Sequence, residues 1–300
     1  MKFLKNLTTI FCITTLLITL PTINASAESN KNFDDFFNHQ IGVFPELKEY
    51  FEENSNLELV STKNIYYKFS LKDTAKSRDY GEENLNDYIF SEISKEEFEN
   101  DNTLLKGNFK SSPPVDPGYT GDLNDSDSKL RPMLNVFRDP SNRSIFTVES
   151  SFVWKGRPVF AFTDALAISS SASLHPISNT ERSEYAVHSS FTDAYGETHY
   201  TTDVYPNTIT LDKDGVLAEV NIRQYGDYRA GHEWYLICKY IFNNPDLYST
   251  GSLFGEYAHA KLAGWFSSIE DGQLKPALPY MVYSSVKTDV LVHNSNSSLE

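Results

Sequence analysis

A stretch near the middle of the chain alternates between large apolar and small side chains. In residues 159–175, VFAFTDALAISSSASLH, one parity carries Phe160, Phe162, Leu166, Ile168, Ala172 and Leu174, whereas positions 161 to 173 of the other parity hold only Ala, Thr and Ser. Alternate side chains of a strand point to opposite faces, so this pattern predicts one long strand. We expect its bulky row to lie in a dry interior between layers.

Further strands are predicted over most of residues 133–293. Residues 207–222 predict a hairpin, because Asp214-Gly215 is a turn signal between two apolar runs. Residues 232–242, HEWYLICKYIF, are apolar on both parities, which predicts a central strand covered on both faces. In residues 251–266, GSLFGEYAHAKLAGWF, apolar residues recur at helical spacing, which favours a helix.

The region before residue 110 mixes helical and strand patterns. Pro45 is expected to begin a helix over residues 45–53, and residues 57–71 predict a strand pair or one long strand. Residues 85–93 have apolar side chains at helical spacing, and Ser94 with Glu97 matches a capping box. Together the patterns predict a mainly β fold, with a C-terminal antiparallel β-sandwich preceded by a smaller α+β N-terminal region.

Composition divides the chain into four parts. Residues 1–27 predict a signal peptide, and residues 28–109 an acidic α+β region that is a small domain or a pro-segment. Residues 110–132 are rich in Pro, Gly and Asp, which predicts a linker or loop. Residues 133–300 are predicted to form the all-β sandwich domain.

The expected signal peptide consists of a basic start at Lys2 and Lys5, a short apolar run, and the small residues Ala25 to Ala27. A retained membrane anchor is the less favoured alternative, because the apolar run is short for a bilayer. We therefore expect cleavage after Ala27 and secretion, in the manner of a bacterial exporter.

Charge and cysteine content narrow the classes of function. Loss of Lys2 and Lys5 would take the formal charge from −15 to −17, which opposes binding to nucleic acid and electrostatic capture by anionic lipid. Cys238 would then be the one remaining cysteine, so we expect no intrachain disulfide and a small buried thiol in an apolar run.

Catalytic motifs are weak, so we assign no catalytic residue and lean against an enzyme. The chain has no G-x-S-x-G or H-E-x-x-H sequence, and Ser284 with Lys287 is a chance-level S-x-x-K match in a predicted strand. Scattered groups could still converge in space; these are His188, His199, His232, His259, Asp193, Asp203 and Glu233.

No cofactor is assigned either, although calcium is a weak possibility. Two short stretches place oxygen ligands at alternate positions: Asp122, Asn124, Asp125 and Asp127 in one, and Asp212 and Asp214 in the other. Neither completes an EF-hand pattern, and a solvated loop or turn explains both stretches.

Aromatic residues make up 14% of the chain and supply the predicted binding site. Five tyrosines cluster around two predicted turns and could stack on sugar rings or contact a protein. They are Tyr195, Tyr200, Tyr205, Tyr225 and Tyr228. We therefore predict a non-enzymatic binding protein whose partner is an extracellular glycan or protein.

Two alternatives remain open. Residues 159–193 could form a membrane-inserting hairpin of a pore-forming toxin, although Asp164, Ser170 and Asp193 interrupt its apolar face. The scattered acids and histidines could instead assemble the site of an extracellular hydrolase, which an inward-facing His–acid pair would favour.

Overall fold

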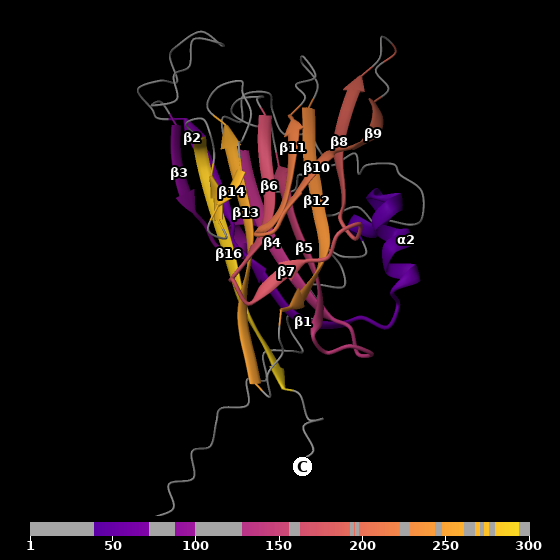
Figure 1. The fold of residues 1–300 in the computed structure, drawn as a ribbon. Helices are drawn as coiled ribbons and strands as arrows, with labels where there is room; N and C mark the ends of the chain where they lie inside the picture. Colours follow the sequence, from indigo (N-terminus) through magenta and orange to yellow (C-terminus); the bar gives the residue numbers. More distant parts are fainter. Residues whose placement is uncertain are drawn as a thin grey trace, which may run out of the picture.

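The computed structural model describes residues 39–71, 88–99, 128–155, 163–192, 195, 198–222, 229–243, 248–260, 268–270, 273–275 and 280–293. The protein is mainly β, with two antiparallel sheets and a small helical region before the strands, as the sequence predicts. Figure 1 shows the sheets as two layers, with helix α2 (Pro45–Glu53) lying against an outer face. No helix within these residues has the length and hydropathy needed to cross a membrane.

The larger sheet, sheet A, contains nine of the described strands. Its order is β3 (Tyr88–Glu92), β2 (Tyr67–Leu71), β4 (Ser128–Arg138), β5 (Ile145–Lys155), β12 (Arg229–Phe242), β8 (Arg182–Thr192) and β9 (Thr198–Pro206). Two shorter strands extend it: β1 (Glu58–Asn64) pairs with β4 beyond β2, and β7 (Leu174–Pro176) pairs with β12 beyond β8.

The smaller sheet, sheet B, contains five of the described strands. Its order is β10 (Thr208–Asp212), β11 (Gly215–Asn221), β6 (Thr163–Ser170), β13 (Tyr248–Ala260) and β16 (Tyr280–His293). A separate pair, β14 (Ser268–Glu270) and β15 (Gln273–Lys275), packs on the outer face of this sheet through Ile269 and Leu274.

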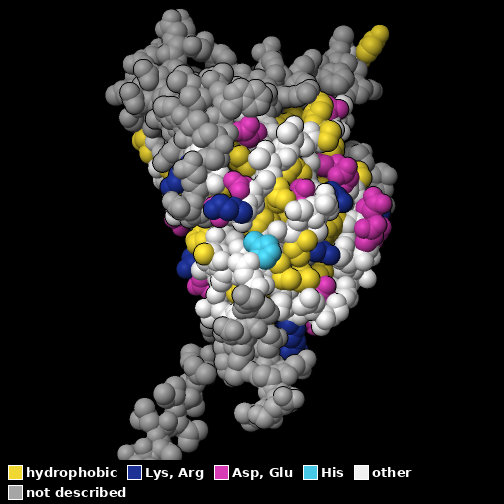
Figure 2. Space-filling view, in the orientation of Figure 1, with side chains coloured by type: hydrophobic (Ala, Val, Ile, Leu, Met, Phe, Trp, Pro, Cys, Tyr) yellow, Lys and Arg dark blue, Asp and Glu magenta, His cyan; other side chains and the backbone are white. Residues whose placement is uncertain are grey.

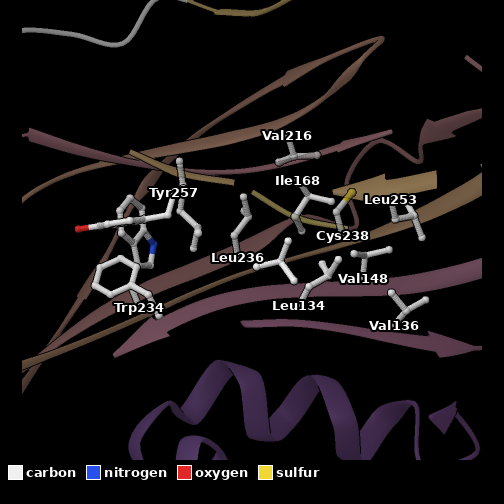
Figure 3. Close-up of a cluster of buried hydrophobic side chains, with 14 of the residues drawn as sticks. Leu134, Val136, Val148, Ile168, Val216, Trp234, Leu236, Cys238, Leu253 and Tyr257 are labelled. Carbon is white, nitrogen blue, oxygen red and sulfur yellow. The ribbon is translucent and has the colours of Figure 1, made fainter. Parts of the chain in front are cut away.

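The main core lies between the two sheets. In Figure 3, Leu134 and Val148 of sheet A face Ile168, Val216 and Leu253 of sheet B. Each such side chain contributes about 1.5–3 kcal/mol to folding when it is fully buried. The predicted alternation in β6 is confirmed here, because the bulky parity faces this core.

The small parity of β6 is buried as well. Ala165 and Ala167 pack against Leu217, Ile269 and Leu274, beneath the β14–β15 pair. The predicted single strand is shorter than expected, because the chain turns at residues 171–173 and re-enters the other sheet as β7. Leu174 of β7 is part of the main core, whereas Phe160 and Phe162 lie outside the described residues.

Strand β12 is the predicted central strand, and it is covered on both faces. Trp234, Leu236 and Cys238 face the main core, while Tyr235 and Ile237 pack under α2. Burial raises the pKa of the Cys238 thiol to about 12, so the thiol stays protonated and behaves as a small apolar group.

Two predicted helices are strands. Residues 248–260 form β13, which has Leu253 and Tyr257 in the main core and Ala258 under β14–β15. A strand buried on both faces is apolar on both parities, and such a run also satisfies helical spacing. The helix predicted near residues 85–93 is likewise wrong, because residues 88–92 form β3, which pairs with β2.

The β10–β11 hairpin is confirmed, but its turn differs from the prediction. Asp212 pairs with Gly215, so Lys213 and Asp214 occupy the turn. Gly215 is needed for a different reason: a Cβ there would lie 2.4 Å from the backbone oxygen of Ile168 on the neighbouring strand. The glycine therefore permits the close approach of β11 to β6.

The N-terminal strands belong to sheet A. β1 and β2 pair with successive parts of β4, so the predicted strand pair lies along one neighbour. β4 begins at Ser128, so residues 128–132 of the predicted linker are strand. Pro132 lies where the partner of β4 changes from β1 to β2, an irregular position that tolerates a residue without an N–H.

Both short helices behave as their sequences predict. α2 begins at Pro45, and α3 (Lys95–Glu99) begins after Ser94, whose Oγ accepts a hydrogen bond from the Glu97 amide at 3.1 Å. Phe98 of α3 is buried on the outer face of sheet A, where Lys155 donates to its carbonyl oxygen at 2.8 Å.

The predicted membrane hairpin is not a hairpin in this fold. β6 pairs with β11 and β13 in sheet B, whereas β8 pairs with β12 and β9 in sheet A. Asp164, expected to interrupt an apolar face, is fully buried and hydrogen-bonded between the sheets. The predicted pairing of residues 159–174 with 183–193 is therefore wrong.

Candidate functional site

The predicted tyrosines do not all lie within the described side chains. Tyr195, in the turn between β8 and β9, is 93% exposed. Tyr205 of β9 packs against the main core and stacks on Tyr185 with ring centroids 6.3 Å apart. The side chains of Tyr200, Tyr225 and Tyr228 fall outside the description. An aromatic binding surface therefore stays a prediction.

A surface groove of about 900 Å³ lies between the β10–β11 turn and the segment from the end of β6 to residue 178. Most of its side chains carry hydrogen-bonding groups, and a few are apolar. Its lining consists of Ser170, Ser171, Ala172, Leu174, His175, Pro176, Ser178, Leu211, Asp212, Lys213, Asp214 and Asn243. Sequence periodicity did not predict the groove, because it forms where the chain crosses from sheet B to sheet A.

The groove contains one of the two predicted calcium stretches. Asp212 accepts a hydrogen bond from the Lys213 amide at 2.5 Å, and Asp214 lies 3.3 Å from the Lys213 ammonium. Both carboxylates thus have local partners. The other stretch, from Asp122 to Asp127, lies outside the described residues.

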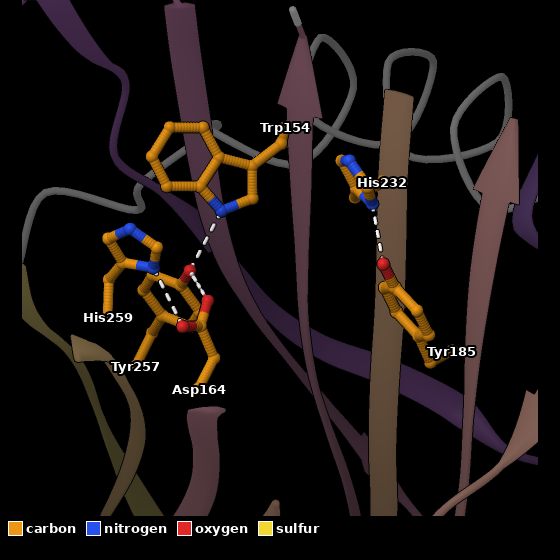
Figure 4. Close-up of polar contacts among 6 residues, drawn as sticks. All are labelled: Trp154, Asp164, Tyr185, His232, Tyr257 and His259. Atoms are coloured by element: carbon orange, nitrogen blue, oxygen red, sulfur yellow. Dashed lines mark hydrogen bonds and ion pairs between the residues drawn. The ribbon is translucent and has the colours of Figure 1, made fainter. Parts of the chain in front are cut away.

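A polar cluster lies inside the sandwich at one end of the main core (Figure 4). Asp164 of β6 and His259 of β13 are directly opposite in the sheet register, and Asp164 Oδ1 lies 2.7 Å from His259 Nδ1. Tyr257 donates its hydroxyl hydrogen to Asp164 Oδ2 and accepts one from Trp154 Nε1 at 2.8 Å. The cluster therefore links β5 of sheet A to β6 and β13 of sheet B.

A second polar pair lies beside this cluster. Tyr185 and His232 stack with an interplanar angle of 6°, and the Tyr185 hydroxyl lies 2.6 Å from His232 Nδ1. Burial, with smaller contributions from His188 and His259, lowers the pKa of His232 to about 3, so this imidazole is neutral at physiological pH.

The Asp164–His259 pair is the inward-facing His–acid pair that would favour a hydrolase. Both side chains are 0% exposed, and His259 Nε2 has no hydrogen-bond partner among the described residues. Ser284 and Lys287 do not assist, because their side chains point to opposite faces of β16 and only Ser284 is buried. With both groups shielded from water, the pair's evident effect is to join β6 to β13 within sheet B, and the Trp154–Tyr257 hydrogen bond links the cluster to sheet A.

A third cluster lies on the outer face of sheet A, beneath residues 39–43. His39 Nε2 is 2.5 Å from Glu233 Oε1, and His188 Nε2 is 3.3 Å from the same oxygen. His188 and Glu233 are diagonal neighbours on β8 and β12, because His188 pairs with Gly231 in the register. His188 and Glu233 were among the residues predicted from the sequence to converge, whereas His39, which lies 194 residues from Glu233, was missed.

Glu233 is ionised in this environment. Burial raises the pKa of its carboxyl, but the charge of His39 and the hydrogen bonds from His188 and His39 outweigh burial and hold the pKa below its ordinary value. The ligand atoms of His39, His188 and Glu233 lie within 4.8 Å of one another, and they form the one group of metal-binding type among the described residues.

Another buried glutamate on the same face has the opposite behaviour. Glu149 of β5 lies opposite Asn135 of β4 and accepts a hydrogen bond from its amide. Burial raises the pKa of Glu149 to about 7, against smaller lowering effects of Asn135, Ser151 and Arg131. Glu149 therefore titrates near neutral pH.

The exposed surface of α2 is acidic. In Figure 2, acidic side chains gather over α2, in accord with its exposed residues Glu46, Glu49, Glu52 and Glu53. Elsewhere on that face the acidic, basic and apolar side chains are interspersed.

Comparison with protein-family models and with curated protein sequences gives no match. Solved structures give remote similarities. A collagen-binding domain from a Staphylococcus aureus adhesin matches at 11% identity and a TM-score of 0.24, over 52% of this chain and 91% of that domain. The delta-toxin of Clostridium perfringens matches at 10% identity and a TM-score of 0.20, over 56% of this chain and 84% of the toxin.

AvmM, which catalyses macrocyclization in alchivemycin A biosynthesis, matches at 15% identity and a TM-score of 0.22, over 51% of this chain and 84% of AvmM. All three TM-scores are too low to support a conclusion about this chain.

Proposed function

We propose that this protein is a secreted, non-enzymatic glycan-binding protein that takes carbohydrate into the groove beside the β10–β11 turn. The observation that supports this most is the groove itself, whose size suits a small oligosaccharide and whose lining is rich in hydroxyl, carboxylate, amide and ammonium groups. Secretion is proposed from the signal peptide predicted over residues 1–27.

Sugars present hydroxyl groups that both donate and accept hydrogen bonds, and the groove offers both functions. Asp212 and Asp214 can only accept, Lys213 can only donate, and the serine hydroxyls do both. His175 is half-buried in the groove, and its imidazole can donate or accept according to its tautomer. Leu211 adds an apolar surface against which the C–H face of a sugar ring could pack.

A glycan array followed by calorimetry with the strongest glycan tests the proposal. We expect His175→Ala and Asp214→Asn each to weaken binding by about tenfold, which corresponds to the loss of one hydrogen bond to the ligand. Glu52→Gln is the matched control, because it removes an exposed carboxylate from α2 and should leave affinity unchanged.

Thermal unfolding of each variant separates loss of binding from loss of folding. An array without any bound glycan would contradict the proposal. Binding that survives both groove substitutions but is lost on Tyr195→Ala would move the site to the predicted tyrosines.

A further inference from the structure

We propose that His39, His188 and Glu233 form a zinc site that fastens the N-terminal segment to the outer face of sheet A. Two imidazoles and one carboxylate are a donor set that zinc commonly uses, and each of these residues is more than nine-tenths buried. His39 comes from the segment before α2, His188 from β8 and Glu233 from β12, so a bound ion would join three parts of the chain.

The carboxylate has coordination capacity that the protein does not use. Both histidines lie beside Glu233 Oε1, whereas Glu233 Oε2 is buried without a hydrogen-bond partner among the described residues. A buried acceptor without a partner is costly, and this one belongs to an otherwise engaged charged group. The two imidazole nitrogens and one oxygen of Glu233 would supply three ligands, and a water molecule would take the fourth position of a tetrahedral ion.

The spacing fits zinc after a small movement. Ligands of a tetrahedral zinc ion lie about 3.3 Å apart, given bond lengths of about 2.0–2.1 Å. His188 Nε2 already lies 3.3 Å from Glu233 Oε1, while His39 Nε2, at 2.5 Å, would withdraw by less than about 1 Å.

An outer hydrogen bond already orients one of the histidines. His188 Nδ1 lies 2.9 Å from Thr202 Oγ1, so the ring can present Nε2 to the ion while Nδ1 donates to the hydroxyl. Metal-binding histidines usually have such a partner on the other ring nitrogen.

One nearby charge opposes the ion. The buried guanidinium of Arg131 interacts electrostatically with Glu233. Arg131 pairs with Val153, which pairs with Glu233, so two strand spacings of about 4.8 Å separate the two backbones. Arg131 is not a ligand and would only weaken the binding of the ion, whereas the three ligands would contact it.

Such a site would have a clear physical role. We expect no intrachain disulfide in the mature chain, so a metal ion would be its cross-link between distant segments. It would hold residues 39–43, and through them α2, against Tyr235 and Ile237 of sheet A.

Cobalt and zinc titrations of the chelator-treated full chain test the proposal. We expect one cobalt ion per chain with the visible absorption bands of tetrahedral coordination, displaced by zinc, and a zinc-dependent rise of several degrees in Tm. Glu233→Gln and His39→Gln should each weaken zinc binding by at least about tenfold, and Thr202→Val by about 10–100-fold. Calcium should give no Tm shift, because it prefers oxygen ligands.

Glu149→Gln is the matched control, since it removes a buried carboxylate from the same face outside the metal-binding group. It should bind cobalt and zinc like the wild type. Absence of tetrahedral cobalt bands in the folded wild-type chain would overturn the proposal even if the ligand variants fail to fold. Equal loss of binding in Glu149→Gln and Glu233→Gln would also overturn it.

Discussion

Two buried clusters pair a carboxylate with histidine, and they use the carboxylate differently. Between the sheets, Asp164 accepts from Tyr257 with one oxygen and lies beside His259 with the other. On the outer face of sheet A, His39 and His188 share one oxygen of Glu233, and the second oxygen has no hydrogen-bond partner among the described residues. Both oxygens of Asp164 are thus engaged by β13 within sheet B, whereas Glu233 can still accept another group.

The largest effect is expected from Asp164→Ala. Its loss would leave the Tyr257 hydroxyl and the His259 ring buried without their acceptor, which should cost about 3–5 kcal/mol of unfolding free energy. Urea unfolding measures this. Asp289→Ala is the control, because Asp289 is exposed on β16 and its loss should change the unfolding free energy far less. Equal effects of the two substitutions would remove the structural role assigned to Asp164.

The buried carboxyl of Glu149 should make the free energy of unfolding depend on pH. Its pKa is about 7 in the folded protein and 4.5 ordinarily, so the folded state binds more protons between these values. The free energy of unfolding should therefore lose up to about 3 kcal/mol from this group as pH rises from 4.5 to 7, and no more above that.

Urea unfolding of wild type and Glu149→Gln across this pH window isolates the effect. His232, whose pKa is lowered to about 3, works in the opposite direction, because below pH 6.5 the unfolded chain binds a proton that the folded protein does not bind. Because His232 is present in both proteins, its contribution cancels when the unfolding free energy of Glu149→Gln is subtracted from that of the wild type. A difference that does not change with pH would contradict the raised pKa of Glu149.

A smaller effect is expected from Glu233→Gln in the presence of a chelator. The amide keeps the shape but loses the negative charge that His39 and His188 face, which should cost about 1–3 kcal/mol in unfolding free energy. At pH 5, where Glu149 is mostly protonated, Glu149→Gln should cost less than about 1 kcal/mol. Urea unfolding at pH 5 measures both variants. Equal losses of unfolding free energy in Glu233→Gln and Glu149→Gln would mean that the charge of Glu233 contributes nothing to stability.

The smallest effect concerns membranes, where we expect none. Both faces of β6 are buried and its Asp164 is held by Tyr257 and His259, so β6 presents no exposed apolar face to a membrane. Micromolar protein should release no dye from liposomes, before or after proteolytic nicking at residues 108–130. Leakage after nicking would revive the toxin alternative.

The sequence predicted the features that depend on local periodicity. The parity of Leu166 and Ile168, the doubly covered strand around Trp234 and the capping box at Ser94 all appear in the fold. Periodicity failed at β13, because burial on both faces removes the alternation that marks a strand.

The clusters could not be predicted in the same way. Asp164 meets His259 because β6 and β13 are neighbours in a particular register, and their residues are 95 positions apart. His39 reaches Glu233 only because the segment before α2 packs on sheet A. The one local signal was Asp164 itself, an acid on an apolar parity, and a buried hydrogen-bonded carboxylate is the physical reason for such an exception.

The pairing of β1 and β2 with β4 has a consequence for proteolytic processing. A cut between α3 and β4 would leave two fragments whose backbones remain hydrogen-bonded from Glu58–Arg138 to Asn64–Met133, with Phe69 still packed on Trp154. The nicked molecule should therefore elute from a sizing column as one particle and separate only in denaturant. The N-terminal fragment that contains β1 and β2 would persist as a second, non-covalently bound chain.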